Sequence, residues 1–204
     1  MTASQIEAAI AHTGISPLPP KALEQLQIHF ELLLKWNARL NLSAIRSPEE
    51  ILQRHFLESL FAAQYIPDEV KTLLDFGSGG GFPGLPIAVA RPNIHITLGE
   101  SQAKKASFLR EVARTAAVPN IDVFQGRLEG LSRTYDAVAL RAVDKMLLAC
   151  RTAAQKLVTG GRLIVFSTIE EAENLVKALP NIAWTEPLTL PHATQRILLV
   201  GKAG

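Results

Sequence analysis

Hydrophobic residues in the N-terminal third of the chain recur at helical spacing. A short apolar stripe predicts a first helix that ends at Gly14. A longer stripe over residues 23–40 predicts a second helix, and Pro20 suits its first turn because the N–H groups there are unpaired anyway. Ser47 is placed as the N-cap of a third helix, which runs up to the next change of pattern. We therefore predict a helical cap over residues 1–68.

From residue 70 onward, short apolar runs alternate with amphipathic helical stretches. Such alternation is typical of a parallel sheet that helices cover on both faces. The last two strands form a hairpin, which would make the C-terminal edge of the sheet antiparallel. We predict a mostly parallel, Rossmann-like α/β domain over residues 69–204. The predicted strands cover residues 71–76, 94–100, 121–126, 135–141, 161–167, 183–190 and 194–201, and the predicted helices cover residues 84–90, 102–117, 144–158 and 170–179.

The composition is that of a folded protein: of 204 residues, 48% are hydrophobic and 20% are charged. The single cysteine, Cys150, lies in an apolar helical stretch, and we expect a buried thiol in a reducing, cytoplasmic setting. The N-terminus lacks the pattern of a secretory signal, and no apolar run is long enough to span a membrane. Without a coiled-coil pattern, a monomer is the default expectation.

Charge and histidine spacing limit the possible chemistry. A net charge of +2 permits a nucleic-acid partner only through a local basic patch. The five histidines show no metal-ligand spacing with acids or with Cys150, so we predict no metal. The sequence also lacks a Cys–His or Ser–His arrangement for nucleophilic catalysis.

The strongest chemical signal is DFGSGGGFPG, residues 75–84, directly after the first strong strand. In a doubly wound sheet, ligands bind at this end of the strands, and glycines let the backbone approach them closely. The glycines match a dinucleotide fingerprint from Gly79 onward, but the turn begins at Gly77, two residues after Asp75. A carboxylate there would repel a pyrophosphate and attract a cation. We favour S-adenosylmethionine, which is cationic and lacks phosphate; a dinucleotide, or a turn without a ligand, is the alternative.

Other residues at predicted strand ends complete the candidate cleft. Glu100 ends the second strand, where its carboxylate can accept both ribose hydroxyls. Residues 128–129 follow the third strand and can frame an adenine. Arg141 ends the fourth strand, and a buried arginine needs a ligand or an acid beside it. A salt bridge from Arg141 to Asp75 or Asp144 is the alternative to a role in the cleft.

Five stretches of the sequence carry a resemblance to one family. They are LLKWNARLNLSAI, RHFLES, DFGSGGGFPGLPIAV, LGESQAKKASFL and LRAV, and they lie between residues 30 and 145. In order and spacing the chain resembles the RsmG family, also called GidB. Members of that family use S-adenosylmethionine to methylate N7 of a guanine in a decoding-region loop of bacterial 16S ribosomal RNA. The resemblance implies a class I methyltransferase sheet, with 16S rRNA or the small ribosomal subunit as the partner.

The turn and the resemblance together give three sets of candidate residues. For the cofactor they are Asp75, Gly77, Ser78, Gly79, Gly81, Phe82, Glu100, Ser101, Gln102, Leu128, Glu129 and Arg141. For catalysis they are Arg141, His55 and Asn41. For RNA they are Lys35, Asn37, Arg39, Arg46, Arg54, Lys104 and Lys105. Two departures from the family stand out: Glu58 replaces the usual Asp, and VFSTIEE lacks the lysine-glycine pair that many members carry after the fifth strand.

The chemistry of guanine N7 fits a sequence without a catalytic base. N7 has a free lone pair, so catalysis can rest on alignment for in-line attack on the methyl group. Some candidates also have structural interpretations: Trp36 as a core residue rather than a stacking platform, His55 as a core histidine, and Lys104 and Lys105 as an ordinary solvated face. Methyl transfer to another substrate and a nicotinamide-dependent oxidoreductase remain as alternative functions.

Overall fold

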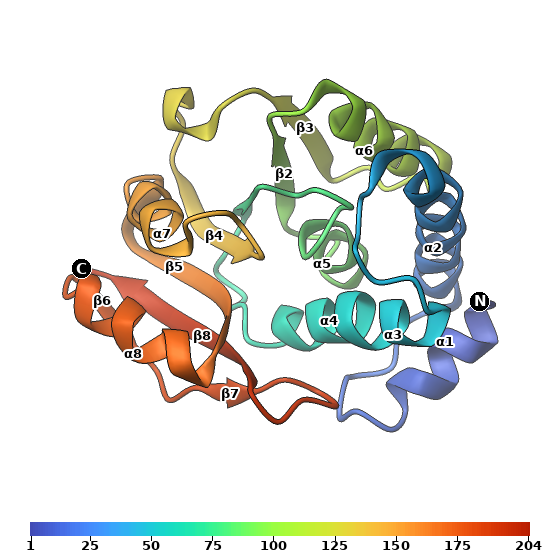
Figure 1. The fold of residues 1–204 in the computed structure, drawn as a ribbon, viewed down its shortest axis with the longest axis horizontal. Coiled ribbons are helices and arrows are strands. Elements are labelled where there is room, and N and C mark those ends of the chain that lie inside the picture. Colours follow the sequence, from blue (N-terminus) through green and yellow to red (C-terminus); the bar gives the residue numbers. More distant parts are fainter.

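A computed structural model describes residues 1–204 and shows one eight-stranded sheet (Figure 1). The strand order is β3-β2-β1-β4-β5-β8-β6, with β7 paired to β8. Strands β1 to β5 pair in parallel, and β8 runs antiparallel to β5, β6 and β7. The predicted mixed sheet with antiparallel C-terminal strands is confirmed. The strands are β1 Thr72–Phe76, β2 His95–Glu100, β3 Ile121–Gln125, β4 Tyr135–Arg141, β5 Leu157–Thr168, β6 Ile182–Trp184, β7 Leu188–Thr189 and β8 Arg196–Ala203.

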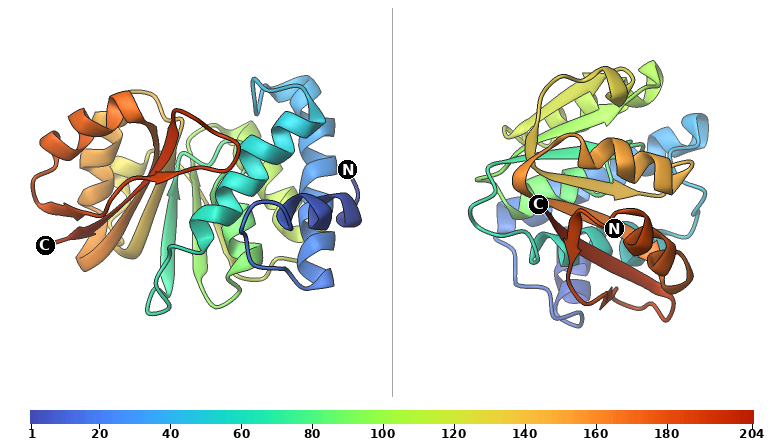
Figure 2. Two further views of the ribbon diagram at one scale, coloured as in Figure 1. Left: turned by 90° about the horizontal axis from the view of Figure 1, so that it is seen from below. Right: turned by 90° about the vertical axis from the view of Figure 1, so that its left-hand side faces the viewer.

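Helices cover both faces of this sheet (Figure 2). The N-terminal helices, α5 and α6 contribute to one hydrophobic core, and α7 and α8 contribute to a second core on the other face. No helix has the length and apolar character that crossing a membrane requires. The helices are α1 Ala3–Ile10, α2 Pro20–Leu40, α3 Pro48–Ile51, the π-helix η1 Leu52–Leu57, α4 Glu58–Ala63, α5 Gly84–Ala90, α6 Ala103–Thr115, the 3₁₀ turn η2 Leu128–Gly130, α7 Met146–Ala154 and α8 Ile169–Ala178.

The N-terminal helices begin where the sequence predicts. Pro20 is the first residue of α2, and the Ser47 side chain accepts a hydrogen bond from the Glu50 N–H at the start of α3. Helix α3, η1 and α4 follow one another without a break, so the predicted third helix contains a widened π turn at its centre. These helices share a hydrophobic core with α5, α6 and the sheet, and their separation as a domain of their own stays a prediction.

Three element boundaries differ from the prediction: α1 ends at Ile10 and not at Gly14, the strand predicted over residues 183–190 is divided into β6 and β7, and α7 is shorter than predicted. The sequence favours a helix up to residue 158, but α7 ends at Ala154 and β5 begins at Leu157. The reason is pairing: Leu157 is the β5 partner of Tyr135, and the Tyr135 N–H donates to the carbonyl of Lys156. An apolar Leu-Val pair fits a buried helix or a buried strand equally well, and the neighbouring β4 decides for the strand.

A buried carboxylate closes the connection from β1 to α5. The Asp75 Oδ2 accepts the Gly84 N–H at 3.0 Å, across the whole glycine turn. This close approach leaves no room for a side chain at position 84, because a Cβ there would lie 2.6 Å from Asp75 Oδ2 and would also meet Leu98. The turn therefore depends on a glycine at its last position as well as at its first.

Substitution Gly84→Ala should destabilise the protein by about 1–3 kcal/mol, the usual cost of forcing extra volume into a packed core. Gly130→Ala is the matched control, because a Cβ at Gly130 meets nothing within 4 Å. Chemical denaturation of both variants measures the effect. Equal stability of the two variants would contradict the close packing described for Gly84.

Candidate cofactor cleft and active site

The main candidate site is a cleft of about 380 Å³ at the carboxyl ends of the central strands. It lies where the strand order reverses, between β1 and β4, which is the position at which doubly wound sheets bind ligands. Its volume is in the range of about 300–1,000 Å³ that is usual for small-molecule sites. The lining residues are Leu42, His55, Gly77, Ser78, Gly79, Gly80, Phe82, Glu100, Ser101, Gln102, Lys105, Arg141, Ala142, Val143 and Asp144.

Bare backbone forms one wall of this cleft. Gly77, Gly79 and Gly81 adopt φ values of 83°, 51° and 90°, which favour glycine. The N–H groups of Gly77 and Ser78 donate to the carbonyl of Gly99, so the start of the turn is fixed to strand β2. A ligand can therefore lie directly against a rigid, side-chain-free surface.

Glu100 provides the carboxylate of the cleft. It is the last residue of β2, and its two oxygens accept the N–H groups of Gly79 at 3.1 Å and Gln102 at 2.8 Å. These two bonds fix the carboxylate at the cleft wall and leave each oxygen able to accept a further hydrogen bond. Glu100 is thus an oriented acceptor at the position where the sequence predicts a partner for the ribose hydroxyls.

Asp75 does not line the cleft, and the prediction that its carboxylate faces the ligand is corrected here. Its side chain is fully buried beneath the turn, where Oδ2 accepts from Gly84 and Oδ1 has no partner. Burial raises the pKa of Asp75 to about 7, and its hydrogen bonds offset part of that cost. Asp75 holds the turn in shape, while the negative charge at the cleft wall comes from Glu100.

The hydrogen bonding of the turn is stronger evidence against a dinucleotide ligand than the charge of Asp75 is. A pyrophosphate binds at free N–H groups of the first helix turn. Here the Gly84 N–H donates to Asp75, and the N–H groups of Leu85 and Ile87 donate to the carbonyls of Gly81 and Pro83. The donors at the start of α5 are therefore already used within the protein, and a phosphate-free nucleoside fits this turn better.

Two histidines stack on Phe82, which lines the cleft. His55 lies 4.7 Å and His29 4.8 Å from the Phe82 ring centroid, both nearly parallel to it. His55 Nε2 is 2.7 Å from the Ser43 hydroxyl, and His29 Nε2 is 2.8 Å from the Gly80 carbonyl. Burial lowers the pKa of His55 to about 3 and that of His29 to about 4. Both rings are neutral at pH 7, so His55 serves as a wall of the cleft that carries no charge.

Arg141 reaches the cleft from the end of β4 and is held by Glu58. The two side chains form an ion pair of 2.8 Å, and Glu58 also pairs with Arg196 at 2.7 Å. A further hydrogen bond joins the Arg141 guanidinium to the carbonyl of Arg54 in η1. Burial lowers the pKa of Arg141, and the Glu58 charge counters that effect. The acid expected beside Arg141 is therefore Glu58, and neither Asp75 nor Asp144 pairs with it.

The structure brings most of the predicted cofactor residues together and leaves others outside. Gly81 is buried behind the cleft wall, Leu128 packs toward Gly99, and the exposed Glu129 side chain does not reach the cleft. Asn41 ends α2 with a φ of 47°, and its side chain accepts from Arg46 rather than entering the cleft. The predicted residues that line the cleft are Gly77, Ser78, Gly79, Phe82, Glu100, Ser101, Gln102, Arg141, His55 and Lys105.

The predicted RNA-binding residues are not equivalent. Asn37 is buried, and its side-chain oxygen accepts the Ser43 N–H, so it has a structural role instead of the predicted contact. Arg54 pairs with Glu50 at 2.9 Å within the same helical segment. Lys35 and Arg39 line a surface hollow between α2 and α6, together with Trp36. The exposed residues that stay available for RNA are Lys35, Arg39, Arg46 and Lys104, with Lys105 at the cleft edge.

Three residues that contact side chains or backbone of the cleft, or pair with Glu58, are not among the predicted site residues: His29, Ser43 and Arg196. His29 had one visible signal, a polar residue on the apolar face of α2, whereas Ser43 and Arg196 had none. Trp36, by contrast, follows its structural interpretation: it packs against the core, with its ring 5.8 Å from Phe108. No cluster of three His, Cys, Asp or Glu side chains is arranged to hold a metal ion.

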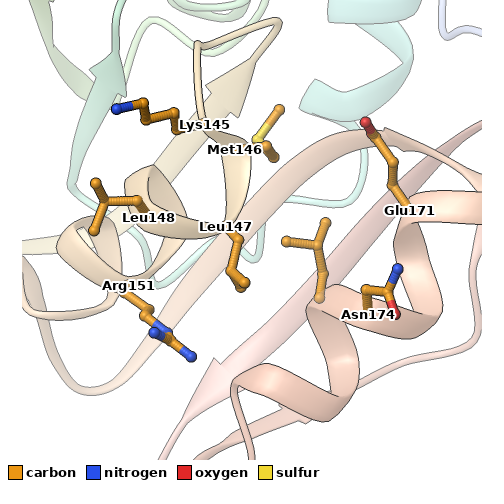
Figure 3. Close-up of a pocket in the computed structure, with 8 residues that line it drawn as sticks. Lys145, Met146, Leu147, Leu148, Arg151, Glu171 and Asn174 are labelled. Carbon is orange, nitrogen blue, oxygen red and sulfur yellow. The ribbon is translucent and has the colours of Figure 1, made fainter.

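A second cavity, of about 430 Å³, lies outside the cleft between α7 and α8 (Figure 3). Its apolar residues are Met146, Leu147, Leu148 and Leu175, and Lys145 and Arg151 stand at its rim. It contains none of the residues predicted for the cofactor, and it shares no lining residue with the cleft.

Comparisons with known proteins agree with this geometry. Residues 22–196 match the model of the GidB family, rRNA small subunit methyltransferase G. The chain belongs to this family. It is 35% identical to ribosomal RNA small subunit methyltransferase G of Stenotrophomonas maltophilia strain K279a, over 93% of this chain and 89% of that one. It is 36% identical to the protein of the same name from Xylella fastidiosa strain 9a5c, over 86% and 84% of the two chains.

The fold is shared with solved methyltransferases. A SAM-dependent methyltransferase from Aquifex aeolicus superposes with a TM-score of 0.64 over 80% of this chain and 97% of that one, at 11% identity. An identity this low shows the fold alone. The predicted family, the class I methyltransferase fold and a methyltransferase activity are confirmed, and S-adenosylmethionine is the cofactor that fits these findings.

Asp75→Asn should change how stability depends on pH. Burial raises the folded-state pKa of Asp75 from 3.8 to about 7, so ionising this group opposes folding. The wild type should therefore lose about 2–4 kcal/mol relative to the variant as pH rises from about 4 to about 7. Denaturation curves across this range measure the difference. If the stability of the two proteins depended on pH in the same way, ionising Asp75 would cost no folding free energy and the prediction would be wrong.

Glu100→Gln should weaken the binding of S-adenosylhomocysteine by about tenfold or more, because a hydrogen bond to a charged acceptor is worth about 1.5–3 kcal/mol. Glu7→Gln, on the exposed face of α1, is the control and should bind normally. Calorimetry gives both affinities. Unchanged binding by the Glu100 variant would place the ligand elsewhere.

Proposed function

We propose that this protein transfers a methyl group from S-adenosylmethionine to N7 of a guanine in a decoding-region loop of bacterial 16S ribosomal RNA. Membership of the rRNA small subunit methyltransferase G family supports the reaction and the substrate class. The observation that carries the proposal within the structure is the cleft, in which a glycine turn, an oriented Glu100 and Arg141 meet at the switch point of the sheet.

The residues of the cleft suit this cofactor. Gly77 and Gly79 would contact the amino-acid part through bare backbone, and Glu100 would accept the ribose hydroxyls. Asp75 and two backbone carbonyls accept the N–H groups at the start of α5, so these donors are not free for a phosphate. S-adenosylmethionine supplies an electrophilic methyl group on a positively charged sulfur.

The protein's own contribution to the reaction is alignment. N7 carries its lone pair in neutral guanine, so no proton has to be removed first, and the neutral His55 matches that requirement. Fixing the base in line with the methyl group can lower the barrier by about 7–11 kcal/mol in favourable cases. The rigid turn, the Phe82 stack and the Glu58–Arg141 pair all serve this positioning.

RNA would approach over the basic residues that border the cleft. Lys105 lies at its edge, and Lys104 is exposed one residue earlier on α6. Lys35 and Arg39 on α2 extend this surface. We further propose that the protein acts as a monomer in the cytoplasm, where ribosomal subunits are assembled.

Labelled methyl transfer tests the function. Small ribosomal subunits from cells that lack this protein should accept one methyl group on a 16S rRNA guanine, whereas free guanosine should not. Mapping the methylated position identifies the guanine. Comparable methylation of free nucleosides would contradict the RNA specificity, and preferential binding of NADH over S-adenosylhomocysteine would contradict the choice of cofactor.

A further inference from the structure

A smaller cavity adjoins the cofactor cleft and has no function assigned so far. Its volume is about 210 Å³, below the usual range for drug-sized ligands and suited to a single base. It shares Arg141, Ala142 and Val143 with the cleft, so a group inside it lies next to the place of the methyl donor. The walls come from the ends of β4 and β5, the starts of α4, α7, α8 and β8, the η1 segment and Leu190.

Arg141, which lines this cavity, carries an unused donor. The Arg141 side chain is only 10% exposed, and its Nη1 is buried without a hydrogen-bond partner, although Nη2 binds Glu58 and the carbonyl of Arg54. The Phe166 ring lies 5.1 Å from the guanidinium carbon and also lines the cavity. A buried donor without a partner is costly, so a ligand acceptor at this point would remove a penalty that the free protein bears.

Glu171 also lines this cavity and is an oriented acceptor. Its N–H donates to the Thr168 hydroxyl at the N-cap of α8, and its Oε2 accepts the Ser167 hydroxyl at 3.2 Å. Glu171 forms no ion pair in the structure, so no lysine or arginine side chain is bound directly to its carboxylate. In Figure 3 its carboxylate lies at the Met146 end of the α7–α8 cavity, away from Asn174.

We propose that this cavity, lined by Arg141, Phe166, Ser167 and Glu171, holds the target base and makes the enzyme specific for guanine. Glu171 accepts hydrogen bonds from N1–H and the 2-amino group, and Arg141 Nη1 donates to O6. Among the bases, only guanine has two adjacent donors beside a carbonyl oxygen. Adenine would turn the N1 lone pair toward the carboxylate and is therefore rejected. This inference rests on the proposed function.

The same carboxylate would assist the chemical step. The N7 lone pair forms the new bond to the methyl carbon, and the electron pair of the broken carbon–sulfur bond stays on sulfur. The purine thereby gains a positive charge, which withdraws electrons from N1–H and strengthens its hydrogen bond to Glu171. A fixed acceptor that binds more tightly as charge develops lowers the barrier as well as selecting the base.

A substrate change paired with a residue change tests the proposal. Small subunits are reconstituted with guanosine or with inosine, which lacks the 2-amino group, at the methylated position. The wild type should methylate the inosine subunits with a kcat/KM about tenfold lower, because one hydrogen bond to a charged acceptor is lost. Glu171→Ala should be slow on both and should show a guanosine-to-inosine ratio near one.

Glu170→Ala is the matched control, because Glu170 is the exposed preceding residue of α8 and lines neither cavity. It should keep the wild-type activity and ratio. Leu148→Gln should do the same, since Leu148 lines only the α7–α8 cavity. All variants should bind S-adenosylhomocysteine normally, which separates base recognition from loss of the cofactor site.

The outcomes distinguish a failure of the base-recognition proposal from a failure of the proposed function. An equal guanosine-to-inosine ratio in the wild type and in Glu171→Ala overturns the role of Glu171, even if methylation itself proceeds. A loss of base selectivity in Leu148→Gln would move the base to the α7–α8 cavity and also overturns the proposal. Failure of the wild type on guanosine subunits would instead overturn the proposed function.

Discussion

The architecture of the site depends on one hydrogen bond, from the Gly84 N–H to the buried carboxylate of Asp75. This bond joins the end of β1 to the start of α5 across the glycine turn, so it fixes where the backbone meets a ligand. The carboxylate also occupies the helix terminus that would otherwise bind phosphate. Its burial raises the pKa of Asp75 to about 7, so the protein bears an electrostatic cost to keep this turn closed. The same hydrogen bond therefore fixes the shape of the glycine turn and disfavours a phosphate ligand there.

A second buried charge network connects the cleft to distant parts of the chain. Glu58, only 1% exposed, pairs with Arg141 from β4 and with Arg196 from the antiparallel strand β8. Removing one partner of a buried ion pair leaves the other charge uncompensated, which costs about 3–5 kcal/mol. Here Glu58 keeps a second arginine if Arg141 is lost. The network therefore lets Arg141 point into the cleft while the fold retains a neutralised carboxylate.

The sequence predicts the fold well because its periodicity is unambiguous almost throughout. It fails at Leu157, where apolar residues suit either element and pairing with Tyr135 decides. The site is predictable where chemistry and position coincide, as at Gly77, Glu100 and Arg141. It is not predictable where contacts join residues far apart in the sequence: nothing local shows that Glu58 meets Arg196, 138 positions away. Asp75 shows a different limit, since a strand end has two sides and the sequence does not say which one a carboxylate faces.

The N-terminal segment contributes directly to the wall of the cleft. His55 stacks on Phe82 of the turn, and the Arg54 carbonyl accepts a hydrogen bond from Arg141. Both residues belong to η1, whose widened π turn displaces its backbone from regular α-helical geometry. Glu58 follows directly at the start of α4. This short segment, with its π turn, therefore contacts the glycine turn, β4 and β8 at once.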